Sequence, residues 1–282
     1  MGYTPSASRL ERERDRTLSK RRSTSIAIIS TIVFGLVVGF VLSRSSGIKA
    51  VGQSFFSPHY FAISIRPVLG GIWLNFRVMI ITEILVLIFG TLIALARTSR
   101  SPVLYPLRLI ATAYTDLFRG APLLLILYLV GFGIPGLNFS WIPSSAIVLG
   151  TAALTLTYTA YVGEVLRAGI EAVSPTQTMA ARALGLTQWQ TARFVVFPQA
   201  FRKVIPPLLN DLVSLQKDSG LISVLGAIDA IRSAEIVKAQ YYNFTPYIVA
   251  GVAFILLTIP LTRFTDWITK RQDLARVQRG QW

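Results

Sequence analysis

Long apolar stretches constrain the fold of this 282-residue chain more than any other feature of its sequence. Six such stretches lie at residues 26–42, 68–96, 122–134, 142–162, 204–226 and 247–268. A helix needs roughly 20 largely apolar residues to cross the hydrocarbon core of a bilayer. Because unpaired backbone groups are costly in lipid, apolar segments of this length span membranes as helices. The sequence therefore predicts an all-α membrane protein with about six transmembrane helices.

The basic residues are distributed unevenly between the segments that connect these stretches. Most of the 28 Lys and Arg residues precede residue 26, lie within 97–119 or 167–203, or follow residue 262. Since Lys and Arg concentrate in cytoplasmic segments, we expect both termini on the cytoplasmic side. The same bias explains the net charge of +15 without a nucleic-acid partner.

This topology divides the chain into five parts. Residues 1–25 form a basic cytoplasmic leader, 26–43 an N-terminal transmembrane helix, 44–67 an extracytoplasmic segment, 68–270 the membrane core and 271–282 a cytoplasmic tail. A signal peptide is the alternative for the first stretch. Glu11, Glu13 and Asp15 in the leader, and the lack of a convincing cleavage site, favour an uncleaved anchor helix.

The residue types that usually carry catalysis are scarce. Cys is absent and His59 is the one histidine, which removes thiolate metal sites and most histidine chemistry. The chain also lacks the G-x-x-x-x-G-K-[ST] motif that holds ATP phosphates. We therefore expect no catalytic residues, no metal site and no ATPase site in this chain.

The segment at about 174–200 predicts two short helices rather than a plain connection. Ser174 and Pro175 are a typical helix start with a capping hydroxyl, and Gly185 can adopt the left-handed conformation that ends a helix. Thr187 with Gln190 forms a capping-box pattern for a second helix, which Pro198 is expected to interrupt. The pair fits an amphipathic element lying on the membrane as well as a docking element for a cytoplasmic partner.

A resemblance to a known family favours docking. Ala180, Ala181 and Gly185, followed after nine residues by Val195 and then by Phe197 and Pro198, resemble the EAA loop of ATP-binding-cassette (ABC) importer permeases. The segments 71–73, 116–122, 163–167 and 215–221 are similar to the polar amino acid permeases of that class. The resemblance covers about 68–270 and implies a type I fold, a five-helix core to which the first helix is added. Met179 departs from the family, which usually has an acidic residue there.

The resemblance implies a permease subunit of an ATP-driven importer for polar amino acids in a bacterial inner membrane. A second permease, identical or related, would complete the translocation path, and an extracytoplasmic binding protein would deliver the amino acid. ATP and Mg would bind to cytoplasmic ATPase subunits, which the EAA loop would contact, and this chain would bind no cofactor. The residues assigned to that contact are Met179, Ala180, Ala181, Ala183, Leu184, Gly185, Thr187, Trp189 and Pro198.

Polar residues within the apolar stretches are candidates for the substrate path, since a charge at the bilayer centre costs about 2.5–3.5 kcal/mol unless it is paired or hydrated. A lining with both signs of charge suits an amino acid, although structural pairing between helices explains such residues equally well. The candidates are Arg77, Glu83, Asn210, Asp211, Gln216, Lys217, Asp218 and Ser219.

Two i,i+3 pairs, Asp116 with Arg119 and Glu164 with Arg167, lie near the inner ends of predicted spans. A salt bridge along one helix face is the simple interpretation, and a role at a gate or a subunit interface is the alternative.

Two other functions fit parts of this pattern. The first is an ATP-independent secondary transporter or channel, although such proteins usually contain inverted repeats and we find no convincing repeat here. The second is a membrane scaffold that uses the loop only for docking, which would not require so polar a segment at 204–226.

Overall fold

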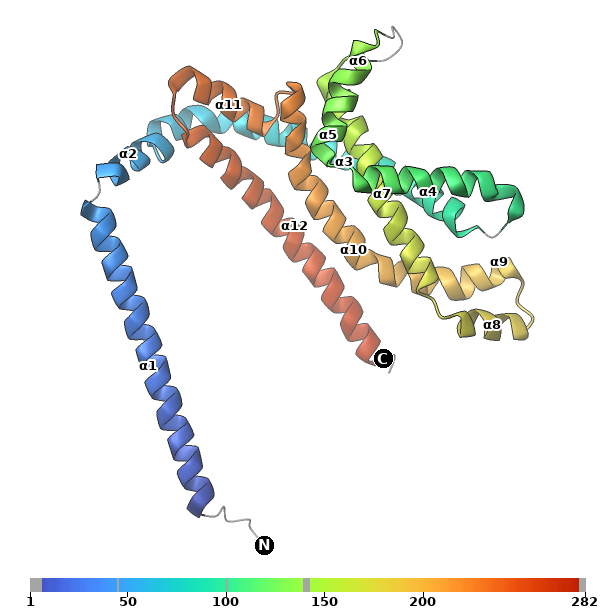
Figure 1. Cartoon of the computed structure of the whole chain (residues 1–282), viewed down its shortest axis with the longest axis horizontal. Coiled ribbons are helices and arrows are strands. Elements are labelled where there is room, and N and C mark those ends of the chain that lie inside the picture. The colour runs from blue at the N-terminus through green and yellow to red at the C-terminus, as the bar shows by residue number, and fades with distance from the viewer. Residues whose placement is uncertain (1–6, 45, 100, 139–142, 279–282) are drawn as a thin grey trace. The chain divides into compact units, whose positions relative to one another are not determined.

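The computed structural model describes residues 7–44, 46–99, 101–138 and 143–278, and every regular element in these ranges is a helix (Figure 1). The α-helices are α1 (Ala7–Arg44), α2 (Ser46–Phe55), α3 (Pro58–Thr98), α4 (Tyr105–Gly120), α5 (Leu123–Tyr128), α6 (Ile134–Gly136), α7 (Ala146–Glu171), α8 (Pro175–Ala183), α9 (Gln188–Thr191), α10 (Phe197–Asp218), α11 (Ala230–Tyr241) and α12 (Thr245–Gln278). Short 3₁₀ turns lie at η1 (Pro102–Leu104) and η4 (Ser219–Leu225), and π turns at η2 (Leu129–Gly133) and η3 (Ala192–Val196).

The prediction of an all-α membrane protein is confirmed, and the count of six spans is approximate. In the described residues, four segments are long and apolar enough to cross a membrane: Arg22–Val41, Gly47–Thr98, Ala146–Glu171 and Thr245–Gln272. The bent pair of α4 and α5 raises this number to as many as five. The predicted span 204–226 corresponds to α10 and η4, whose polar residues keep it out of this set.

The chain divides into two units at Ser57. The first contains α1 and α2. Helix α1 begins at Ala7, so the predicted leader from this residue on is helical and continuous with the anchor helix. Its described apolar side chains are exposed, Phe34 by 71%, as suits a helix that faces lipid.

The second unit is built around α3, which lies along α7 and also contacts α10, α11 and α12 (Figure 1). Helix α3 starts at Pro58, so the end of the predicted extracytoplasmic segment is part of this helix. A Cβ on Gly90 would lie 2.9 Å from Val162 Cγ1, which shows that small residues let α3 and α7 approach closely. The core that α3 and α7 form together with α10 and η4 contains Val78, Val86, Leu154, Val162, Leu215 and Ile222.

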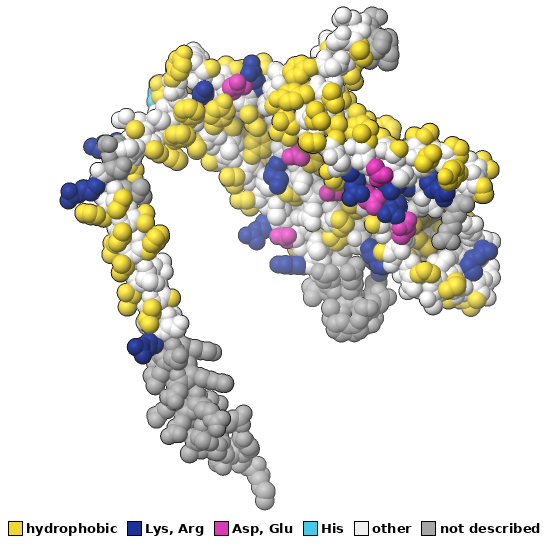
Figure 2. Space-filling view, viewed as in Figure 1, with side chains coloured by type: hydrophobic (Ala, Val, Ile, Leu, Met, Phe, Trp, Pro, Cys, Tyr) yellow, Lys and Arg dark blue, Asp and Glu magenta, His cyan; other side chains and the backbone are white. Residues whose placement is uncertain are grey.

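Helix α4 occupies a segment whose basic residues predict a cytoplasmic connection. It ends at Gly120 and meets α5 at an angle of 106°, with Pro122 in an extended conformation between them. Leu109, Ile110 and Leu117 are exposed on α4, and Figure 2 shows this apolar surface beside a cluster of charged side chains. A count of Lys and Arg residues does not distinguish an amphipathic helix from a loop, so the distribution of charge did not predict α4.

Candidate functional site

The loop at 174–200 folds into two helices, α8 and α9, at the ends of α7 and α10 (Figure 1). Helix α8 begins after Ser174 with Pro175 in its first turn, as predicted. The prediction that the Ser174 hydroxyl caps α8 was wrong, because this side chain makes no capping hydrogen bond. Its backbone carbonyl instead accepts from the Gln177 and Thr178 amides at 3.1 and 3.4 Å.

Backbone hydrogen bonds hold the turn between α8 and α9 tightly. Gly185 adopts a left-handed φ of +85°, as predicted for the end of α8. The Leu186 amide donates to the Ala181 carbonyl at 3.2 Å and the Gly185 amide to the Arg182 carbonyl at 3.0 Å, which is the Schellman pattern. The predicted capping box at Thr187 and Gln190 is confirmed, with both of its hydrogen bonds formed. The two helices are therefore joined by a rigid corner.

The prediction that Pro198 interrupts the second helix was wrong. The chain stays helical from α9 through the π turn Ala192–Val196 into α10, where Pro198 lies in the first turn. Proline cannot donate to the carbonyl four residues earlier, and the π turn changes the hydrogen-bond register just before it. Motion of α9 is thus connected directly to α10.

Several large apolar side chains of this hairpin are exposed. Met179, Leu184 and Trp189 are exposed by 62%, 84% and 65%, whereas Ala181 on the inner side is 5% exposed. Ala180, Ala183, Gly185, Thr187 and Pro198 are exposed as well. Large exposed apolar side chains on a rigid element are typical of a docking site. Nearly all the residues predicted for docking are therefore accessible.

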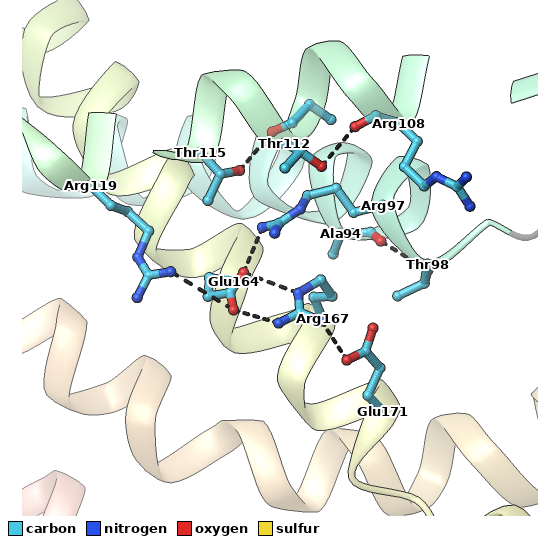
Figure 3. A network of polar contacts seen from close by, with 11 residues as sticks. Ala94, Arg97, Thr98, Arg108, Thr112, Thr115, Arg119, Glu164, Arg167 and Glu171 are labelled. Atoms are coloured by element: carbon cyan, nitrogen blue, oxygen red, sulfur yellow. Dashed lines mark hydrogen bonds and ion pairs between the residues drawn. The ribbon is translucent and has the colours of Figure 1, made fainter. Parts of the chain in front are cut away.

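Glu164 is the centre of an ion cluster that joins three helices (Figure 3). Its carboxylate accepts from Arg97 of α3 at 2.5 Å and from Arg167 of α7 at 2.6 and 3.0 Å. Arg119 of α4 lies 3.8 Å away, and Arg167 also pairs with Glu171. The predicted Glu164–Arg167 pair is confirmed. In the described residues Arg119 pairs with Glu164 and not with Asp116, so the predicted Asp116–Arg119 pair was wrong.

Partial burial strengthens this cluster. The side chains of Arg97 and Glu164 are 12% and 20% exposed, whereas that of Arg119 is 42% exposed. Water screens a charge pair less as burial increases, so Arg97 contributes more than Arg119 to holding the helices together. The cluster fixes the end of α7 against α3 immediately before the chain enters α8.

The candidate path residues fall into groups of different exposure. Arg77, Asn210 and Lys217 are exposed; Glu83, Asp211 and Asp218 are half-buried; Gln216 and Ser219 are buried. Glu83 of α3 and Asp211 of α10 are close enough for their charges to repel each other. Asp211 Oδ2 has no hydrogen-bond partner within the described part of the chain.

Two of the path candidates are bound by neighbouring helices. The Tyr158 hydroxyl donates to Asp218 at 2.7 Å, and the Thr258 hydroxyl donates to Gln216 Oε1 at 2.6 Å. These contacts give both residues a structural role between α10 and the helices beside it. The structure thus brings Glu83 and Asp211 together, while Arg77 and Lys217 lie on exposed surface.

A buried polar junction that no sequence pattern predicted lies between α3 and α11. Asn75 is 1% exposed, and its Nδ2 donates at 3.0 Å to both Asp229 Oδ2 and the Ser219 carbonyl. The Ala230 amide donates to Asn75 Oδ1 at 3.2 Å, and Asp229 Oδ1 caps α11 by accepting from the Arg232 amide at 2.8 Å. An asparagine inside an apolar stretch was the available signal.

Comparison with known proteins gives consistent matches. The model of the family described as "Binding-protein-dependent transport system inner membrane component" matches residues 25–274, and so includes the apolar part of α1 as well as the predicted core. A putative glutamine transport system permease protein of Rickettsia conorii is 35% identical over 71% of this chain and 90% of its own length. The arginine transport system permease protein of Bacillus subtilis is 36% identical over 69% of this chain and 87% of its own.

A solved structure agrees with these relatives. The crystal structure of an amino acid ABC transporter with histidines superposes with a TM-score of 0.67 at 32% identity. The match covers 73% of this chain and 94% of that one.

Proposed function

Because this chain belongs to the family of binding-protein-dependent transport system inner membrane components, we propose that it forms the translocation path of an ATP-driven importer for polar amino acids. The chain is a multi-pass inner membrane protein and a permease subunit of an ABC importer. In the proposal a second permease, identical or related, completes the path. Both termini lie in the cytoplasm, as the distribution of Lys and Arg predicts.

The exposed apolar hairpin of α8 and α9 is the observation that supports coupling to an ATPase. ATP and Mg bind to the cytoplasmic ATPase subunits in this proposal, since the sequence of this chain lacks a phosphate-binding loop. Met179, Leu184 and Trp189 provide apolar contact area, and burial of such side chains drives association. Met179 replaces the acidic residue usual in the family, so its contact is one of packing rather than of charge.

The connections of the hairpin explain how its motion reaches the path. Helix α8 follows α7 after a short turn, and α9 continues through the π turn into α10. The Glu164 cluster ties α7 to α3 and α4. A displacement of the hairpin by the ATPase therefore moves several helices together, as alternating access requires.

For the substrate we propose a polar amino acid, delivered by an extracytoplasmic binding protein. The similar proteins include permeases named for glutamine and for arginine. Every free amino acid carries an ammonium group, and Asp211, with an unpartnered carboxylate oxygen beside Glu83, offers negative charge to it. Asp211 is therefore our first choice among the path residues.

The test is reconstitution of the permease with its ATPase subunits and binding protein in proteoliposomes. We expect uptake of a radiolabelled amino acid only when ATP is supplied on the side of the membrane where the ATPase subunits are bound. We also expect the loaded binding protein to stimulate ATP hydrolysis. Uptake by the permease alone, driven by an ion gradient without ATP, would contradict the proposal and favour the secondary transporter or channel.

A further inference from the structure

A cavity of about 1040 Å³ lies between the α8–α9 hairpin and the ends of α3, α4 and α7. Of the three large apolar docking residues, Met179 contributes to its lining, whereas Leu184 and Trp189 do not. Its lining comes from the end of α3, the start of α4, the end of α7, the hairpin, and the π turn that leads into α10 together with the first residue of α10. None of the functions proposed above uses it. Apolar residues such as Leu95, Ile170 and Phe197 form part of the wall, together with the polar residues Ser99 and Thr178.

The charged residues of this wall are mainly basic. Arg97, Arg108 and Arg182 reach the cavity from three different helices, and Glu171 is the acidic residue in the lining. Arg97 is neutralised by Glu164, and Glu171 is bound by Arg167. Arg108 and Arg182 form no ion pair with any residue that the structure describes. Neither guanidinium is therefore neutralised by a carboxylate among the described residues, although Arg108 also lies over the ring of Tyr105, 5.1 Å from its centroid.

The hydrogen bonds of these two arginines are weak and leave most of their donors free. Arg108 donates to the Ser99 carbonyl and Arg182 to the Leu186 carbonyl, each at 3.3 Å. A guanidinium has five N–H donors arranged to bind carboxylate or phosphate oxygens in pairs. Arg108 and Arg182 are thus available to an anion.

The position of the cavity at the ends of two spanning segments indicates which anion can reach it. Thr98 and Glu171 are the last residues of two membrane-spanning segments, Gly47–Thr98 and Ala146–Glu171, and Thr98 and Glu171 both line the cavity. Lipid phosphates lie at the ends of spanning helices, and basic pockets between such helices bind anionic headgroups. The apolar part of the wall suits the glycerol and the first methylenes of a lipid.

From this placement we infer that the cavity binds a phosphate group through Arg108 and Arg182, with an anionic phospholipid as its source in the membrane. A phosphate held by both side chains would link α4 to α8. The cavity shares Met179 and α8 with the coupling hairpin, but neither the coupling nor the substrate proposed above depends on a bound phosphate.

Native mass spectrometry of the intact importer complex provides the test. The complex is extracted from nanodiscs with equal amounts of phosphatidylglycerol and phosphatidylcholine, and the lipids that remain bound are counted. We expect retained phosphatidylglycerol in the wild type and about tenfold weaker retention in the Arg108→Gln/Arg182→Gln double variant, since hydrogen bonds to charged groups are worth about 1.5–3 kcal/mol. The Arg108→Lys/Arg182→Lys variant keeps the charge and should retain more lipid than the glutamine variant.

The control is Arg202→Gln, which removes an exposed arginine of α10 outside the lining and should leave retention unchanged. The melting temperature and the subunit composition of each variant complex establish that it is folded and assembled. A second arm titrates inorganic phosphate and pyrophosphate into the complex in phosphatidylcholine alone. Tight binding of these ions that depends on Arg108 and Arg182 would support the phosphate site and assign it a soluble source.

Two results would overturn the inference. One is equal retention of phosphatidylglycerol and phosphatidylcholine by the wild type, with no binding of free phosphate. The other is undiminished retention of phosphatidylglycerol by a folded double glutamine variant. Both outcomes leave the importer function itself untouched.

Discussion

The backbone of α3 at Gly71 lies directly against the start of α11 at Ala230. A Cβ atom on Gly71 would be 2.3 Å from the Ala230 nitrogen, far inside van der Waals contact. Next to this contact Asn75 binds the Ala230 amide and Asp229. The position of α11 on the bundle therefore depends on the absence of a side chain at Gly71.

We expect Gly71→Ala to lower the free energy of unfolding by about 1–3 kcal/mol, because backbone atoms of α11 must shift to admit the methyl group. Thermal unfolding of the purified protein measures the change. Gly70→Ala is the matched control, since nothing lies within 4 Å of its added Cβ. Equal melting temperatures for the two variants would show that α3 and α11 are not in close contact.

Replacing Glu164 with Gln should destabilise the inner ends of α3 and α7. The charge of Arg97, which is 12% exposed, would lose its carboxylate, at a cost of about 2 kcal/mol. Glu171→Gln serves as the control because that carboxylate is 54% exposed, and we expect a loss of at most about 0.5 kcal/mol. Thermal unfolding of both variants decides the matter, and equal losses would refute a central role for Glu164.

The left-handed backbone at Gly185 makes this position sensitive to the shape of the side chain that replaces the glycine. Gly185→Val forces a β-branched residue into φ of +85°, at a cost of about 1–2 kcal/mol, and should lower ATPase stimulation by the loaded binding protein. Gly185→Asn keeps most of the stimulation, because Asn tolerates this conformation. Equal loss of stimulation in both variants would contradict this explanation. It would show that any side chain at position 185 is harmful, whether or not it tolerates the left-handed backbone.

Trp189→Ala should weaken association with the ATPase subunits by about 2 kcal/mol, or more than tenfold in Kd, if the hairpin docks through its apolar surface. Titration of the detergent-solubilised permease with purified ATPase subunit measures the affinity. Ile228→Ala removes a comparably exposed apolar side chain from the turn before α11, and no change is expected. An unchanged affinity for Trp189→Ala would argue against docking through this face.

Asp211→Asn should reduce amino acid uptake about tenfold, because it removes the charge offered to the substrate ammonium. Assembly with the ATPase should be unaffected. Asp266→Asn, an exposed position on α12, controls for loss of a carboxylate. Wild-type uptake in the Asp211 variant would exclude this residue from the substrate path.

Local signals predicted much of this structure. The capping box at Thr187 and the left-handed Gly185 follow from the preferences of individual residues over a single turn, and both are present. The apolar stretches predicted an all-helical membrane protein, because length and hydropathy decide that question before packing does.

Relationships between distant residues could not be predicted in this way. Arg97 and Glu164 are 67 positions apart, and Asn75 and Asp229 are 154 apart, so no local pattern connects them. A spacing of three positions predicts a pair between Arg119 and Asp116, but packing of α4 against α7 places Glu164 within reach of Arg119. Ser174 likewise fits a capping pattern in the sequence, but its side chain forms no capping hydrogen bond in the structure.

The π turn at Ala192–Val196 is equivalent to one extra residue inserted into a continuous helix. Each residue of an α-helix advances the chain by about 100° around the axis. The wider π turn takes up its extra residue within its own loop, so the helix before it and the helix after it keep their alignment. Deleting one residue from this turn should leave Trp189 close to its present direction, whereas a deletion from the α-helical part of α10 would rotate the hairpin by about 100° around the axis.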